Sequence, residues 1–244
     1  MTYLKSDSDI VLSAIKSALS LNCDKNNINL HEPYFKNTNA LKYVKDCIDK
    51  GWVSSAGLWV DKFEEHIRQF TGAKHAVAVT NGTVGLRLSL HCVGVRHGEE
   101  VITSPFTFVA TANAISHLGA FPHFTDINAS NLSLSSRLIA ERLSKVALKK
   151  GGKVFNIETG RRIAAILPVH VFGIPADIIE IKKVAKEWNL PIVEDAAEAL
   201  GSRHYIDENN YVHCGLIGDI GVISFNGNKL ITTGGGGVII TNNE

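Results

Sequence analysis

Cysteine is scarce in this sequence of 244 residues, and its four copies are scattered. They form neither a Cys-x-x-Cys pair nor the spacing of a zinc site, which argues against a disulfide framework and predicts reduced thiols. His213 beside Cys214 is a weak metal signal because no second pair of ligands lies nearby, so we expect no metal site. The chain also opens without a positively charged stretch followed by an apolar core, the pattern of a secretory leader. We therefore expect a cytoplasmic protein.

An excess of one charge and a long apolar run are also lacking. The sequence has 25 Lys and Arg against 24 Asp and Glu, which argues against nucleic acid or a membrane surface as partner. No apolar stretch approaches the length of a membrane span. What is present, 45% hydrophobic and 20% charged residues, is typical of a globular domain that can bury a sizeable core. The expected partner is a small molecule.

Apolar segments of strand and helix period alternate along the chain. Helices are predicted at 39–50, 60–70, 84–92, 109–118, 135–149 and 178–189, and strands at 75–79, 101–103, 120–126, 163–170, 191–195 and 220–223. This alternation predicts an α/β fold with a mostly parallel sheet sandwiched by helices. Residues 151–162 read as a projecting hairpin. We expect residues 1–30 to form a helical arm, with Ile10, Leu12, Ile15 and Leu19 on its helix and an extended turn at 30–33, and residues 31–244 to form one large domain.

Polar and small residues fall where the predicted strands end. Ligands of such sheets bind beyond the carboxyl ends of the strands, so we expect one shared site there. The turn at 80–83 feeds a helix whose first N–H groups can hold a phosphate, although an ordinary helix cap fits the same residues. Phe108 can point into the core or over a flat ligand. The other strand-end candidates are residues 104–107, His170, Asp195 and Ser224.

Lys229 stands alone in a stretch of small polar residues and glycines, from Ser224 to Gly237. A lysine delivered by a strand into an open pocket suits a Schiff-base nucleophile. On local sequence alone, a surface lysine beside a flexible loop is the more common meaning of this pattern.

Five motifs occur in order: TNGT at 80–83, TFVAT at 107–111, VHVFG at 169–173, VEDAAEALG at 193–201 and SFNGNK at 224–229. Together they resemble the DegT/DnrJ/EryC1/StrS family of nucleotide-sugar aminotransferases, which are fold-type I pyridoxal-phosphate enzymes. The resemblance implies a seven-stranded type of sheet. Residues 30–33, 156–160 and 224–229 are similar, more narrowly, to the branch that aminates C4 of a UDP-4-keto-6-deoxy-N-acetylhexosamine toward legionaminic acid or bacillosamine.

The resemblance implies a role for each site residue. Lys229 would bind the cofactor covalently and act as general base and acid, and Asp195 would pair with the pyridinium nitrogen. Ala196 would let the ring face approach, and Glu198 would hydrogen-bond near O3′, where many relatives have Gln or His. The other expected contacts are Gly82, Thr83 and Ser224 to the phosphate, and Phe108 stacked on the ring.

The resemblance also implies partners. We expect a UDP-ketosugar substrate, glutamate as amino donor and a homodimer, with residues 52–59 at the site rim or the subunit contact. Buried core tryptophans are the alternative meaning of Trp52 and Trp59. The resemblance implies a smaller domain of well over a hundred residues beyond the lysine strand, whereas this sequence stops at Glu244, so we expect either a fragment or a truncated protein. Two further hypotheses remain, a 3-aminotransferase for a dTDP- or UDP-3-ketosugar and a truncated, non-catalytic module that binds the cofactor or serves assembly.

Overall fold

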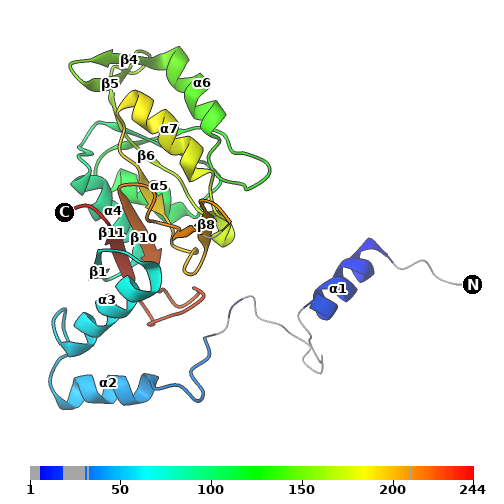
Figure 1. The fold of residues 1–244 in the computed structure, drawn as a ribbon, viewed down its shortest axis with the longest axis vertical. Helices are drawn as coiled ribbons and strands as arrows, with labels where there is room; N and C mark the ends of the chain where they lie inside the picture. Colours follow the sequence, from blue (N-terminus) through cyan, green and yellow to red (C-terminus); the bar gives the residue numbers. More distant parts are fainter. Residues whose placement is uncertain (1–5, 19–30, 32, 209) are drawn as a thin grey trace, which may run out of the picture. The chain divides into compact units, whose positions relative to one another are not determined.

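The computed structural model describes residues 6–18, 31, 33–208 and 210–244, which form two compact units, Met1–Glu32 and Pro33–Glu244 (Figure 1). The first unit contains helix α1 (Asp7–Ala18), which begins with reciprocal hydrogen bonds between Ser6 and Asp9. None of the side chains of α1 is buried. Position 19 of the predicted first helix and positions 30 and 32 of the predicted turn lie outside the described residues.

The second unit is built on one continuous sheet. Within the described residues seven strands adjoin in the order β1, β11, β10, β7, β6, β2, β3, with parallel bridges from Ile166 to Ile192 and from Val169 to Asp195 joining β6 to β7. All run parallel except β11, which is antiparallel to both neighbours. The predicted α/β class with a mostly parallel sheet is therefore confirmed. The strands are β1 (His75–Val79), β2 (Glu100–Thr103), β3 (Phe121–Phe124), β6 (Arg162–Leu167), β7 (Val193–Asp195), β10 (Ile220–Ser224) and β11 (Gly237–Thr241).

Helices cover both faces of this sheet because its strands are apolar on both sides. Val101 and Val222 pack with the helices of one face, whereas their neighbours Ile102 and Ile223 pack on the other. The first face carries α4 (Gly82–Cys92) and α5 (Val109–Ser116). The second carries α3 (Leu58–Thr71), α6 (Ser136–Val146) and α7 (Ile178–Trp188). Such two-sided burial is typical of parallel sheets.

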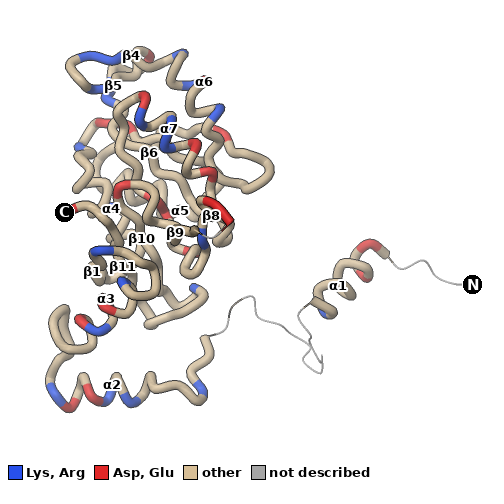
Figure 2. The backbone as a smooth tube through the Cα atoms, viewed as in Figure 1, with Lys and Arg blue, Asp and Glu red and all other residues tan. Residues whose placement is uncertain are grey.

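Helix α2 (Ala40–Asp49) precedes α3, and none of its residues is buried. Figure 2 shows basic and acidic residues interspersed along the backbone of α2, α3 and α7. Across the part of the chain that the structure describes, no helix is both long and apolar enough to cross a membrane.

The structure differs from the sequence expectations in four places. The predicted helix 135–149 ends at Val146, and β4 (Ala147–Lys150) and β5 (Lys153–Asn156) then form a hairpin through two glycines of positive φ. The sequence predicted a hairpin that projects from the surface, but β5 pairs with β6 and so joins the hairpin to the sheet. The hairpin of β8 (Arg203–Tyr205) and β9 (Tyr211–His213) was not predicted. Nor was β11, because its glycine-rich start weakens the strand pattern.

Strand β11 returns the chain directly beside the strand it left. Ser224, the last residue of β10, lies opposite Gly237, the first of β11. A side chain at Gly237 would place its Cβ 2.8 Å from the carbonyl carbon of Asn81, so only glycine fits. Lys229 thus lies in a loop held at both ends by the sheet.

Candidate active site

The carboxyl ends of five strands surround one cavity of about 560 Å³. Its lining comes from the segments that follow β1, β2, β6, β7 and β10. These segments are far apart in the sequence, and the parallel sheet gathers them at one edge. The expectation of a single shared site at the strand ends agrees with this geometry.

One end of the cavity is the N-terminus of α4. The side chain of Asn81 caps the helix, since its Oδ1 accepts the N–H of Val84 at 2.9 Å. The N–H groups of Gly82 and Thr83 belong to the first helical turn, where no intrahelical acceptor exists. Ser224 packs against this turn so closely that a Cβ on Gly82 would lie 3.1 Å from the Cβ of Ser224. The turn is therefore a capped helix start, and its first N–H groups are also placed as an anion site requires.

Lys229 reaches into the cavity, and its side chain is only 11% exposed. Its Nζ lies 3.0 Å from Oε1 of Glu198 and 5.8 Å from the ring centroid of Phe108. Phe108 caps α5 and leaves its own ring largely exposed. A loop lysine with a carboxylate partner inside a cavity differs from the flexible surface lysine that local sequence favours.

Asp195 ends β7 as a buried carboxylate. Thr111 donates its hydroxyl to Oδ2 at 2.6 Å, and the N–H of Ala197 donates to Oδ1 at 3.1 Å. Thr107 in turn lies 2.7 Å from the Thr111 hydroxyl. Burial raises the pKa of Asp195 above its ordinary value, against the opposing effects of these two donors and the charge of Lys229. A buried carboxylate of this kind gains from a cationic partner in the cavity.

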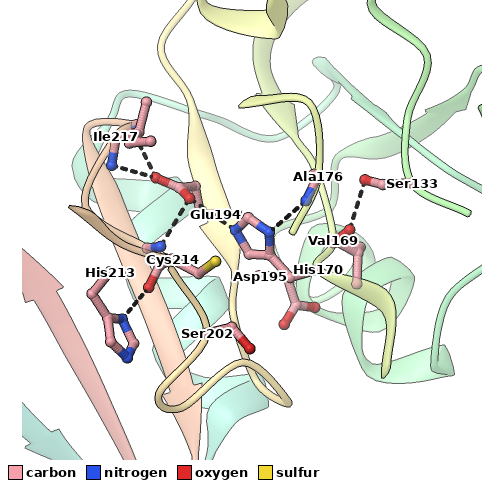
Figure 3. A network of polar contacts seen from close by, with 12 residues as sticks. Ser133, Val169, His170, Ala176, Glu194, Asp195, Ser202, His213, Cys214 and Ile217 are labelled. Carbon is pink, nitrogen blue, oxygen red and sulfur yellow. Dashed lines mark hydrogen bonds and ion pairs between the residues drawn. The ribbon is translucent and has the colours of Figure 1, made fainter. Parts of the chain in front are cut away.

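A second buried network supports the end of β7 from behind (Figure 3). His170 accepts the N–H of Ala176 at Nδ1, which places its proton on Nε2, and Nε2 lies 2.8 Å from Glu194. Glu194 also accepts the N–H groups of Gly215, Ile217 and Gly218. Burial alone would raise the pKa of Glu194, but the hydrogen bonds from His170 and from the backbone outweigh it and hold that pKa below its ordinary value.

Cys214 and His204 join His170 in this network. Donor atoms of the three lie within 4.8 Å of one another. Both nitrogens of His170 are already engaged, with Glu194 and with Ala176, so a metal ion would have to displace one of these contacts. We therefore interpret the cluster as a structural one that stabilises the neighbouring end of β7, where Asp195 lies.

Seven of the eight expected site residues line the cavity, and Ala196 does not. Its side chain is fully buried on the other face of the sheet, beside Cys214 and Ile223. The alternation of β7 continues past its end, so Asp195 and Ala197 face the cavity and Ala196 faces away. Ala197 is the alanine that lines the cavity in place of Ala196. The seven are Gly82, Thr83, Phe108, Asp195, Glu198, Ser224 and Lys229.

The sequence assigns three lining residues no role of their own, although Thr107 is a strand-end candidate and all three lie in the motifs; they are Thr107, Thr111 and Phe172. Thr107 and Thr111 stand four apart at a helix start, a spacing that places both hydroxyls on one face. Phe172 is not singled out within its motif. It is 71% exposed, lies edge-on to Phe106 and has a left-handed backbone with φ of 54°, a conformation that costs a non-glycine residue about 1–3 kcal/mol.

Residues 52–59 do not line the cavity. Trp59 donates its Nε1–H to Asp46 at 2.8 Å and stacks on Tyr43, and it ties α3 to α2. Trp52 is exposed. The site-rim role expected for this segment is thus not supported by the described cavity, and its role as a subunit contact remains a prediction.

The fold and the cavity together define an α/β domain whose strand ends present a lysine, a buried carboxylate and a helix N-terminus. The chain belongs to the DegT/DnrJ/EryC1/StrS aminotransferase family, whose model matches residues 36–244.

The chain is also similar to individual proteins and to solved structures. GDP-perosamine synthase of Vibrio cholerae is 36% identical over 206 residues, which cover 84% of this chain and 50% of that protein. DesI, solved in the presence of its TDP-sugar product, is 29% identical with a TM-score of 0.73, over 87% of this chain and 48% of the other. NtdA from Bacillus subtilis with bound cofactor PMP is 25% identical with a TM-score of 0.70, over 92% and 48%. The chain thus spans about half the length of these relatives, and their names do not single out the legionaminic acid or bacillosamine branch.

Proposed function

We propose that this chain is the cofactor-holding part of a nucleotide-sugar aminotransferase that uses pyridoxal 5′-phosphate. The observation that carries the proposal is the placement of Lys229, Asp195 and the α4 N-terminus around one cavity. Relatives described with a PMP cofactor and with a TDP-sugar product support it.

The donor set fits the cofactor's parts. The N–H groups of Gly82 and Thr83, with the hydroxyl of Ser224, suit a phosphate. Asp195 offers a buried carboxylate to a protonated ring nitrogen, and the exposed ring of Phe108 offers a stacking surface. Pyridoxal 5′-phosphate supplies a ring that accepts the charge left when a C–H bond beside the reacting nitrogen breaks.

The protein's own groups would then divide the work. Lys229 would hold the cofactor through Nζ and, once the amino donor has displaced it, move a proton to and from the substrate carbon. Asp195 would keep the ring nitrogen protonated, and Thr111 and Ala197 would hold the carboxylate in place. Ala197 is small enough to leave the ring's face room.

For the substrate we propose a nucleoside-diphosphate ketosugar, with glutamate as amino donor. A UDP-4-keto-6-deoxy-N-acetylhexosamine is the specific candidate, from the motifs at 30–33, 156–160 and 224–229. The GDP- and TDP-linked sugars in the names of relatives make the nucleotide a variable to test. Assays with UDP-, GDP- and dTDP-ketosugars would decide it, and a preference for a 3-keto substrate would favour the 3-aminotransferase alternative.

Cofactor attachment is the first measurement. We expect the full-length protein to show the absorbance of a lysine-bound cofactor, and borohydride to fix a cofactor adduct on the peptide that contains Lys229. The matched control is Lys183→Ala, which removes an exposed lysine paired with Glu180 and should leave the adduct unchanged. No adduct at Lys229 would contradict the proposal and favour a non-catalytic module.

We also propose that the full-length protein is a cytoplasmic homodimer. The aromatic side chains at the cavity mouth, Phe106, Phe108 and Phe172, are all exposed in the single chain. Exposed apolar surface beside a ligand cavity is covered in working enzymes to exclude water. Sedimentation of the full-length protein at micromolar concentration should give a dimer. A fully active monomer would disprove the claim.

A further inference from the structure

Glu198 joins two segments that meet at the cavity. Its Oε1 accepts the ammonium of Lys229 at 3.0 Å, and its Oε2 accepts the backbone N–H of Phe172 at 3.2 Å. One carboxylate thus connects the lysine loop with the turn Val171–Gly173 that follows β6.

The turn that holds one oxygen of Glu198 is itself fixed. Ser202 donates its hydroxyl to the carbonyl of Gly173 at 2.7 Å. A Cβ on Gly173 would lie 2.9 Å from the carbonyl oxygen of Glu198, so the two segments touch through their backbones. Phe172 keeps its left-handed backbone against this support. The carboxylate of Glu198 is therefore held by a turn that is itself fastened to the segment carrying Glu198.

Few of the described groups surround the ammonium of Lys229. Within the described residues, Glu198 is its ion-pair partner, Asp195 acts on it at longer range, and the ring of Phe108 faces its Nζ. Asp195 already has Thr111 and Ala197 as donors. The lysine side chain is 11% exposed and that of Glu198 is 39% exposed, so the pair lies at the cavity wall with the carboxylate partly open to water.

An ammonium ion cannot act as a nucleophile, because its nitrogen has no free lone pair. A base within hydrogen-bond reach must take a proton before the nitrogen can attack a carbonyl carbon. In the described part of the chain, the Oε1 of Glu198 lies at that distance from Nζ, and Lys229 is its hydrogen-bond donor. The geometry therefore supplies both the resting partner of the lysine and the acceptor of its proton.

We propose that Glu198 is the positioning residue that holds Lys229 in the empty site and accepts its proton when the cofactor is captured. This rests on the proposed function. One proton passes from Nζ to Oε1 of Glu198. The freed lone pair then forms the bond from Nζ to the aldehyde carbon, and the aldehyde oxygen leaves as water once it has taken up the two hydrogens that remained on Nζ.

The test begins on cofactor-free protein with formaldehyde and cyanoborohydride, which methylate neutral amines. Peptide mass spectrometry reads the methylation of Lys229 as a function of time at neutral pH. In Glu198→Gln the labelling of Lys229 should be slower by about 10²-fold, because the lysine loses the acceptor of its proton. Glu198→Asp keeps a carboxylate and should restore part of the rate. Glu180→Gln, which breaks an exposed ion pair elsewhere, is the matched control and should change nothing.

The second readout is the rate at which added pyridoxal 5′-phosphate is captured at neutral pH. A general base contributes about 10²-fold or more, so capture by Glu198→Gln should be slower by about that factor. Labelling of Lys229 at the wild-type rate in both folded variants would overturn the inference and leave Glu198 as an anchor for Phe172 alone. Slower labelling in Glu198→Gln with no cofactor capture by the wild-type protein would instead count against the proposed function, so the two failures are distinct.

Discussion

Replacing Lys229 with alanine is expected to abolish amino transfer in the full-length protein, with a loss of about 10⁴-fold or more. No other lysine lines the cavity in the described part of the chain, so nothing there can replace its covalent and proton-transfer roles. The fold should survive, since Lys229 lies in a loop and belongs to none of the core clusters. Turnover with glutamate and a ketosugar, measured beside the circular dichroism spectrum, checks both statements.

Lys183→Ala serves again as the control, because it removes one lysine and one exposed ion pair far along the chain. It should retain wild-type turnover. If Lys229→Ala turned over at the wild-type rate, the assignment of the nucleophile would be wrong, whatever the state of the fold.

Asp195→Asn is expected to retain the cofactor while turnover falls by about 10³-fold or more. The amide matches the carboxylate in shape: its oxygen can still accept the N–H of Ala197, and its NH₂ can donate to Thr111. It cannot hold a proton on the ring nitrogen, because it carries no charge. Cofactor absorbance and turnover of the same sample separate binding from catalysis, and a loss below tenfold would count against the role of Asp195.

The same substitution should stabilise the cofactor-free protein. The folded pKa of Asp195 is raised by burial, so its contribution to stability is present below the unfolded pKa of about 3.9 and is lost as pH rises through the folded value. At neutral pH the wild-type protein bears the full cost of that buried charge, and Asp195→Asn removes it. Thermal melts from pH 4 to 8 should give a higher midpoint for the variant, by a margin that grows with pH. Equal midpoints at pH 7 would contradict this.

Much of the fold could be predicted because strands buried on both faces have continuous apolar sequences. Apolar runs such as 220–223 need partners on both faces, and helices of matching period follow them. Strand β11 could not be predicted because its pairing depends on glycine at position 237, where backbone contact with Asn81 matters more than strand preference. The β8–β9 hairpin could not be predicted because its strands are short and polar.

The site could be predicted as a set of strand ends but not to the residue. Ala196 and Ala197 are chemically identical, and only the register of β7 decides which one faces the cavity. The contact of Glu198 with Phe172 depends on a left-handed backbone at a phenylalanine, which local preferences disfavour. Tertiary contacts of Ser202 and Gly173 stabilise this backbone conformation instead, and no local sequence pattern indicates such contacts.

Because Ser224 pairs with Gly237, the lysine loop between them can change without disturbing the sheet. The loop leaves β10 and re-enters the sheet in the neighbouring strand, so its two ends are adjacent. Changes of length or composition between them need not alter the order or spacing of any strand. The nucleophile's surroundings can therefore diverge between related proteins while the sheet, the helix N-terminus at Gly82 and the carboxylate of Asp195 stay in place.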